Sequence, residues 1–87
     1  MVKLNTCVFI SGKGSNLKNL ILRSRDDTFP IKIKLVVTDK KKAEGLIFAK
    51  LNSIPYMVIN KKLRNNENYI FQILKKNKIS FICLAGY

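Results

Sequence analysis

The chain has 87 residues, of which 47% are hydrophobic, and these values predict one small folded domain over residues 1–87 and exclude a disordered chain. Its 17 Lys and Arg against five Asp and Glu give a net charge of +12, which favours anionic partners without selecting one, and it has no histidine, the commonest general base. No apolar run reaches the ~18–20 residues of a membrane span and no secretory signal can be recognised, so we expect a cytoplasmic protein with no membrane partner.

The chain opens with the pattern of a strand, a glycine-containing loop and a helix. The strand is expected at Cys7–Ile10, a β-rich run that ends at Ser11-Gly12. Ser15 or Asn16 stands where a helix N-cap belongs. The residues spaced as the buried face of the helix are Leu17, Leu20 and Ile21.

A second strand and a second helix follow. Ile31–Val37 is an apolar run interrupted by two lysines, and it ends in Thr38-Asp39. The spacing predicts a helix over Ala43–Leu51. Its inner side is expected to carry Leu46, Ile47 and Lys50.

The last third of the chain repeats the pattern. A third strand is expected at Pro55–Ile59, and the polar stretch Asn60–Asn66 leads into a third helix. A fourth strand is expected at Ile79–Leu84. The inner face of the third helix comprises Tyr69 or Ile70, Ile73 and Leu74.

Strands that alternate with helices predict an α/β fold, here a half-Rossmann unit. We expect a four-stranded parallel sheet with flanking helices and the strand order third, second, first, fourth. The fourth strand would then be an edge made of Phe81, Ile82 and Leu84, and apolar edges of this kind are normally paired or covered. The sheet is therefore expected to continue in a longer fold, and the chain looks truncated.

Two cysteines lie inside apolar runs. Cys7 and Cys83 show no CxxC spacing, so both are expected to be buried, reduced thiols that act as small hydrophobic residues. Neither belongs to a pattern of metal ligands, and we expect no metal site.

The first loop is the candidate binding site. In an open parallel sheet, ligands bind at the carboxyl ends of strands, and Ser11–Asn16 stands at the end of the first strand. Gly12 and Gly14 allow close approach of the backbone, and the amides that begin the helix point at the ligand. Ser15 and Asn16 add side-chain donors, so a phosphate monoester is the expected guest. The spacing alone matches neither the dinucleotide fingerprint nor the Walker loop and is also compatible with a plain tight turn.

Four segments in order resemble one enzyme family. Val8–Ile21, VFISGKGSNLKNLI, and Val36–Leu46, VVTDKKKAEGL, are similar to the opening segments of the glycinamide ribonucleotide formyltransferases. Ile54–Pro55 fits the start of that family's third strand, and Ile82–Tyr87, ICLAGY, matches the close of its fourth. The resemblance covers the N-terminal part of the family's fold.

This resemblance implies a one-carbon transferase of purine synthesis, which moves a formyl group from the cosubstrate 10-formyltetrahydrofolate to glycinamide ribonucleotide. The family's catalytic Asn, His and Asp lie beyond the matched segments, so no catalytic residue is assigned here and the chain alone is expected to be inactive. A separately encoded C-terminal half would be a partner that completes it. The substrate phosphate is expected to bind at Gly12, Gly14, Ser15 and Asn16.

Arg64 is the one candidate contact to the folate. The family places an arginine just before the third helix, and Arg64 stands near that position. Aligning Tyr69 with the family's tyrosine puts Asn66 there instead, so Arg64 is equally well explained as a solvated charge.

Two other functions fit parts of the sequence. The lysines are compatible with a small basic nucleic-acid-binding module, but the aromatic residues lie in apolar runs, where core packing is expected. Formyltransferases acting on methionyl-tRNA or hydrolysing formyltetrahydrofolate share the expected fold, but their first loops do not usually read GSN. The aromatic residues in question are Phe9, Phe48, Phe71 and Phe81.

Overall fold

The computed structural model describes residues 3–85 and contains one parallel four-stranded sheet in the order β3-β2-β1-β4. This order and the alternation of strands with helices confirm the expected half-Rossmann architecture. Gly86 and Tyr87, the last residues of the ICLAGY segment, lie outside the described residues. The elements are β1 (Leu4–Ile10), α1 (Ser15–Ser24), β2 (Ile31–Thr38), α2 (Leu46–Leu51), β3 (Tyr56–Val58), α3 (Lys61–Arg64), α4 (Glu67–Lys76) and β4 (Phe81–Ala85).

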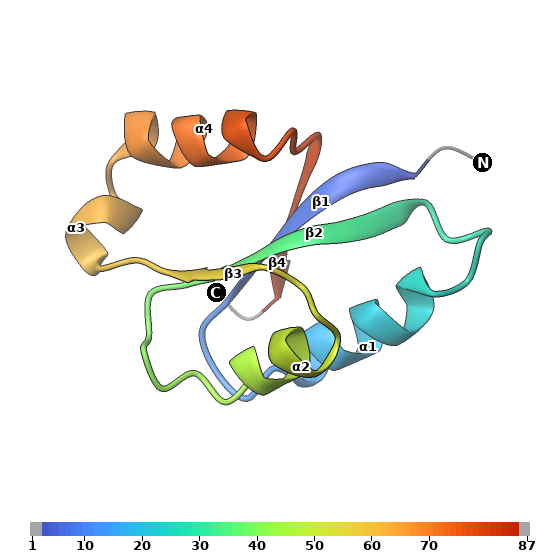
Figure 1. Cartoon of the computed structure of the whole chain (residues 1–87). Coiled ribbons are helices and arrows are strands. Elements are labelled where there is room, and N and C mark those ends of the chain that lie inside the picture. Colours follow the sequence, from blue (N-terminus) through green and yellow to red (C-terminus); the bar gives the residue numbers. More distant parts are fainter. Residues whose placement is uncertain (1–2, 86–87) are drawn as a thin grey trace.

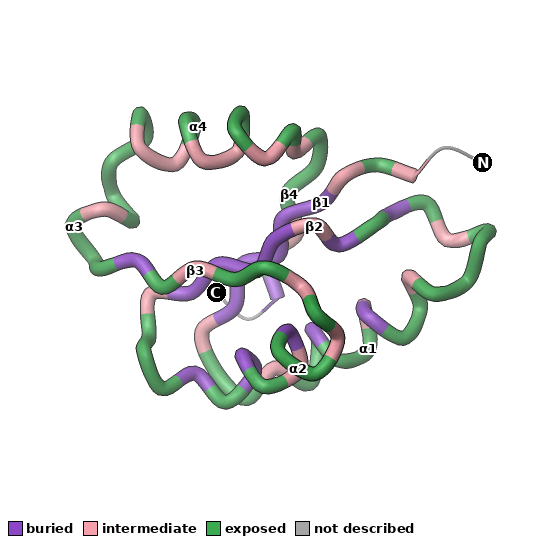
Figure 2. Tube along the Cα trace, viewed as in Figure 1, coloured by how far each residue is buried: buried purple, intermediate pink, exposed green. Residues whose placement is uncertain are grey.

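Helices cover both faces of the sheet (Figure 1). Helices α1 and α2 lie on one face, and α3 and α4 lie on the other. The layer of α1 and α2 is the better packed of the two (Figure 2). Both of its helices contribute buried residues to the core, whereas no residue of α3 or α4 is buried. No helix in residues 3–85 is long and apolar enough to span a bilayer.

The central strands β1 and β2 form the middle of the core. Their apolar runs are buried on both faces, as is usual for parallel strands covered by helices. Val8 and Ile10 belong to the cluster under α1 and α2, while Cys7 and Phe9 pack toward α4. Successive side chains point to opposite faces, so one short apolar run supplies both halves of the core.

Helix α2 departs from the expectation. It begins at Leu46 rather than Ala43, and Ala49 is fully buried on its inner face. Ile47 is 54% exposed and Lys50 is exposed, so their predicted inward placement is wrong. The ammonium group of Lys50 lies 5.5 Å from the ring centre of Tyr56, a cation–π contact that holds it outside the core.

The polar stretch before the third predicted helix contains a short helix of its own, α3. The side chain of Asn60 caps it by accepting the amide of Leu63 at 2.7 Å. Asn66 caps α4 in the same way by accepting the amide of Tyr69 at 3.0 Å. Two N-caps six residues apart are a sequence signal for this arrangement. The expected inner face of α4 is confirmed, with Tyr69, Ile70, Ile73 and Leu74 half-buried against the sheet.

Strand β4 lies at the edge of the sheet and is the apolar edge that the sequence predicts. It runs over Phe81–Ala85, and Leu84 is 68% exposed. Of the four phenylalanines expected in the core, Phe71 and Phe81 are exceptions, since they are 62% and 47% exposed. Phe71 lies on α4, a helix with no fully buried residue, and Phe81 lies on the edge strand β4. No further layer of the described residues covers either side chain.

The two cysteines are reduced but not equally buried. Cys7 is fully buried, as expected, whereas Cys83 is only half-buried. Cys83 is opposite Val8 in the β1–β4 register and Cys7 is opposite Ile82, so the two thiols point to opposite faces of the sheet. Burial raises the pKa of Cys7 to about 12, which keeps this thiol protonated at neutral pH.

Candidate functional site

The loop between β1 and α1 lies at the carboxyl end of the central strand and turns on Gly14. Gly14 is the N-cap of α1, with φ 80° and ψ 20°, a left-handed conformation that favours glycine. Ser15 is the first helical residue, so the predicted N-cap at Ser15 or Asn16 is wrong. Glycine takes the cap because the chain must turn sharply to bring α1 back onto the sheet.

Gly14 also packs directly on Gly45, which precedes α2. A Cβ on Gly14 would lie 2.3 Å from Cα of Gly45, closer than real Cβ atoms approach. The amide of Gly45 donates a hydrogen bond to the carbonyl of Gly12 at 3.1 Å. The two loops are thus joined backbone to backbone, and Gly45 is a determinant of the site that local sequence reasoning missed. The glycine in the KAEGL segment was the available signal.

Gly12 has a different environment. A Cβ built on it would meet nothing within 4 Å, and the residue is exposed. The space beside its backbone is therefore open to a ligand.

The first turn of α1 presents backbone donors at the carboxyl end of β1. The first helical hydrogen bond runs from the amide of Lys18 to the carbonyl of Gly14 at 2.9 Å. The amides of residues 15–17 precede this bond and have no acceptor within the helix. Since α1 has ten residues and no acidic residue in its first turn, its N-terminus carries a positive partial charge that attracts anions. The side chains of Ser15 and Asn16 are both exposed at this turn.

A cavity of about 210 Å³ adjoins the loop. Ser11 and Gly12 line one side of it, and the segment after β2 lines the other. Three cationic side chains and one carboxylate, that of Glu44, complete the lining, so the cationic groups outnumber the anionic ones at this cavity. The cations are Lys13, Lys40 and Lys42.

Asn16 faces a second cavity, of about 280 Å³, between α1 and β4. Cys83, Leu84 and Ala85 line the side of this cavity that belongs to β4. Asn16 therefore joins the candidate phosphate loop to the exposed edge of the sheet. A chain segment that covered β4 would also adjoin Asn16.

Arg64, the candidate folate contact, lies on α3 and forms an ion pair. Its Nη1 lies 2.7 Å from Oδ2 of Asp39, the residue that follows β2. The side chain of Asp39 is only 5% exposed, whereas that of Arg64 is 43% exposed. The other carboxylate oxygen, Oδ1, is buried without a hydrogen-bond partner. Arg64 thus neutralises a buried carboxylate, and its contact with folate stays a prediction.

The arrangement suits binding of an anion. The loop offers backbone amides, two exposed polar side chains and neighbouring lysines. Within residues 3–85, no group of three or more Cys, Asp or Glu residues is placed to hold a metal ion.

The comparisons with known proteins all point to the same enzyme family. The formyl transferase family matches residues 4–87. The trifunctional purine biosynthetic protein adenosine-3 of Homo sapiens is 37% identical over 98% of this chain, which corresponds to 9% of that protein. The phosphoribosylglycinamide formyltransferase of Haemophilus influenzae is 37% identical over 92% of this chain and 40% of its own length.

A solved structure extends the likeness to three dimensions. The phosphoribosylglycinamide formyltransferase of Brucella melitensis superposes with a TM-score of 0.88 at 36% identity, over 98% of this chain and 46% of that one. The chain thus spans less than half the length of these relatives. It belongs to the formyl transferase family and corresponds to the N-terminal portion of the phosphoribosylglycinamide formyltransferases.

Proposed function

We propose that the loop between β1 and α1, at Gly12, Gly14, Ser15 and Asn16, binds the phosphate group of glycinamide ribonucleotide. The observation that carries this proposal is the left-handed Gly14, which begins α1 at the carboxyl end of β1 and leaves the first amides of the helix without an acceptor inside it. Ser15 and Asn16 add side-chain donors, and the lysines at the adjoining cavity complement a phosphate dianion.

Binding of the ribonucleotide is one part of formyl transfer, and we propose that this chain alone does not carry out the reaction. The resemblance implies 10-formyltetrahydrofolate as the formyl donor and places the residues that move protons beyond the matched segments. Arg64, the only residue here assigned to the folate, is paired with Asp39. Because Arg64 is engaged in this pair, we propose that the chain does not hold the formyl donor tightly by itself. A cytoplasmic location is a separate prediction from the sequence.

Replacing Ser15 and Asn16 by alanine is expected to weaken binding of glycinamide ribonucleotide at least about tenfold, because two donors to a charged group are lost. A thermal-shift titration of the purified chain measures this, since a ligand that binds only the folded state raises its melting temperature. The unligated variant should melt close to the parent chain, because both side chains are exposed.

A matched variant tests whether the effect belongs to the loop. Asn68→Ala/Ser80→Ala removes the same two side-chain types from exposed positions elsewhere and should leave ribonucleotide binding unchanged. Equal loss in both variants would contradict the proposal. A shift with a short oligonucleotide but none with the ribonucleotide would instead favour the basic nucleic-acid-binding module.

We propose further that a C-terminal half, supplied as a separate chain, pairs with the outer edge of β4. Phe81, Ile82 and Leu84 expose apolar surface there, and the strand carries no charged residue or proline that would block pairing. Because Asn16 faces the cavity beside β4, this partner would also adjoin the phosphate loop.

Mixing this chain with the separately produced C-terminal half of the Haemophilus influenzae relative is expected to give a complex and formyl transfer that neither part shows alone. Leu84→Lys should weaken the complex at least about tenfold, because a charge on an edge strand opposes strand pairing. Analytical ultracentrifugation measures the complex and a formyl-transfer assay measures activity. Leu51→Lys, on a 73% exposed residue of α2, is the control and should change neither. Absence of any complex would exclude this partner.

A further inference from the structure

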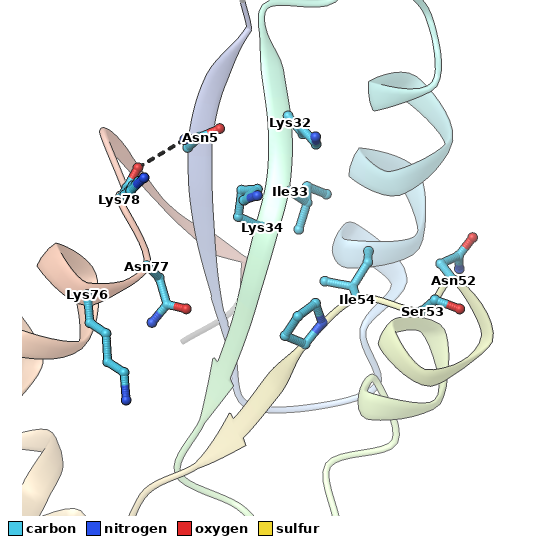
Figure 3. Close-up of a pocket in the computed structure, with 11 residues that line it drawn as sticks. Asn5, Lys32, Ile33, Lys34, Asn52, Ser53, Ile54, Lys76, Asn77 and Lys78 are labelled. Atoms are coloured by element: carbon cyan, nitrogen blue, oxygen red, sulfur yellow. Dashed lines mark hydrogen bonds between the residues drawn. The ribbon is translucent and has the colours of Figure 1, made fainter.

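A further cavity lies at the opposite end of the sheet from the phosphate loop. It measures about 580 Å³ and opens at the amino ends of the strands (Figure 3). Strand β3 pairs only with Val36–Thr38, so the first half of β2 has no neighbour on this side. The volume is within the range of small-molecule sites, roughly 300–1,000 Å³. This cavity plays no part in the function proposed above.

Four lysines line this cavity from two separate elements. Lys32 and Lys34 lie on β2, and Lys76 and Lys78 lie at the end of α4 and in the turn that follows it (Figure 3). The turn is fixed to the sheet, because Nδ2 of Asn5 donates to the carbonyl of Lys78 at 3.1 Å. The cationic groups are thus attached to two elements whose relative position is set by the fold.

These four ammonium groups are not neutralised by the protein. No Asp or Glu is among the described residues that line the cavity. Within residues 3–85, none of the four side chains has a hydrogen-bond or ion-pair partner, whereas Lys3 and Arg25 in the adjoining cavity donate to main-chain and side-chain oxygens. The cavity therefore has an unbalanced positive charge, and a multivalent anion would be attracted to it.

The helix dipole accounts for only part of the cluster. A lysine in the last turn of α4, such as Lys76, is stabilised by the negative end of that helix. Lys32 and Lys34 are strand residues and gain nothing from a helix terminus. Their positive charge at this cavity is therefore not explained by the helix dipole.

The remaining lining offers no surface on which a nucleic-acid base could stack. Ile33, Ile54 and Pro55 form an apolar wall, and no aromatic residue is among the described residues that line the cavity. Single-stranded nucleic acids are usually held by stacking on aromatic side chains, which this cavity lacks. The side chain of Asn52 is already occupied, since it bonds to Arg25 and to the carbonyl of Phe48.

We propose that this cavity binds a linear polyphosphate anion, with the phosphate chain held between Lys32 and Lys34 on one side and Lys76 and Lys78 on the other. The shared chemistry is that of adjacent phosphate groups, whether in inorganic triphosphate or in the triphosphate of a nucleotide. The site is independent of residues 11–16.

Isothermal titration calorimetry of the whole chain at low ionic strength tests this with inorganic triphosphate, ATP and adenosine. Triphosphate and ATP should bind with one equivalent per chain, and adenosine should not bind. Lys32→Gln/Lys76→Gln should weaken triphosphate binding about tenfold or more. ATP that binds more tightly than triphosphate would identify a nucleotide as the source, and equal affinities would identify the phosphate chain alone.

Two controls separate this site from general attraction to a basic protein. Lys61→Gln/Lys62→Gln removes the same charge from exposed positions on α3, outside the cavity, and should leave triphosphate binding within about twofold of the parent. Ser15→Ala/Asn16→Ala should also leave it unchanged, which distinguishes this site from the phosphate loop. Equal weakening by both lysine pairs, binding of adenosine, or binding only to an oligonucleotide would overturn the proposal.

Discussion

Replacing Gly14 by alanine is expected to remove much of the stability of this chain. The residue has φ 80°, where an L-amino acid costs about 1–2 kcal/mol. The new Cβ would also lie 2.3 Å from Cα of Gly45, and relief of such an overlap by backbone movement costs about 1–3 kcal/mol. Together these terms predict a loss of about 2–5 kcal/mol, or a melting temperature lower by more than about 10 °C for a domain of this size.

Two further glycines make this prediction specific. Gly12→Ala should leave the melting temperature nearly unchanged, because its Cβ would meet nothing within 4 Å. Gly45→Ala should fall between the two, since its φ of −61° suits alanine but its Cβ would lie 2.8 Å from Cα of Gly14. Thermal unfolding followed by circular dichroism measures all three. A Gly14→Ala chain as stable as Gly12→Ala would show that the two loops are not packed as described.

The consequence for function is direct. The glycine pair fixes the start of α1 against the start of α2, so the same contact that stabilises the domain positions the amides of residues 15–17. A phosphate site built from backbone donors is only as well ordered as the loop that carries them.

The second large effect is expected at the ion pair of Arg64 and Asp39. Arg64→Ala would leave the buried carboxylate of Asp39 without its counter-ion, while its Oδ1 already lacks a hydrogen bond. Breaking a fully buried pair costs about 3–5 kcal/mol, but solvent screens Arg64, which is 43% exposed, so we expect about 1–2 kcal/mol. The melting temperature should fall by about 5–15 °C.

A double-mutant cycle tests the stated cause. Asp39→Asn removes the charge and should recover most of the stability lost in Arg64→Ala, because a neutral amide needs no counter-ion. Lys62→Ala, an exposed lysine on the same helix, is the matched control and should change the melting temperature little. Additive effects of Arg64→Ala and Asp39→Asn would show that the pair does not stabilise the chain. The result would also separate a structural role of Arg64 from contact with folate.

The sequence was sufficient for much of the fold. The apolar runs at Cys7–Ile10 and Ile31–Val37 are rich in β-branched and other apolar residues and end at turn residues, and both are central strands. Strand-like runs alternate along the chain with segments that have the apolar spacing of helices. This alternation predicted the strand order and the exposed edge at β4. These features depend on local hydrophobic pattern and on the general chirality of strand–helix–strand connections, which tertiary context seldom overrides.

Short elements were less predictable. Six residues of α2 give fewer than two turns, so a spacing of apolar residues cannot distinguish Ile47 from Ala49 as the inner residue. Ala49 is the inner residue because it packs in the buried cluster against the sheet, which only the tertiary structure shows. Likewise, propensity placed a polar cap at Ser15 or Asn16, and the sharp entry into α1 gave the cap to Gly14 instead.

The sequence by itself determined the fold class, the position of the glycine loop at the end of the first strand and the family to which the chain is similar. Only the tertiary structure brought Gly45 against Gly14, paired Arg64 with Asp39 and placed the lysines of β2 on the same cavity as those at and after the end of α4. The physical reason is distance along the chain: each of these contacts joins residues 25 or more positions apart, and close approach of such residues depends on how the layers pack.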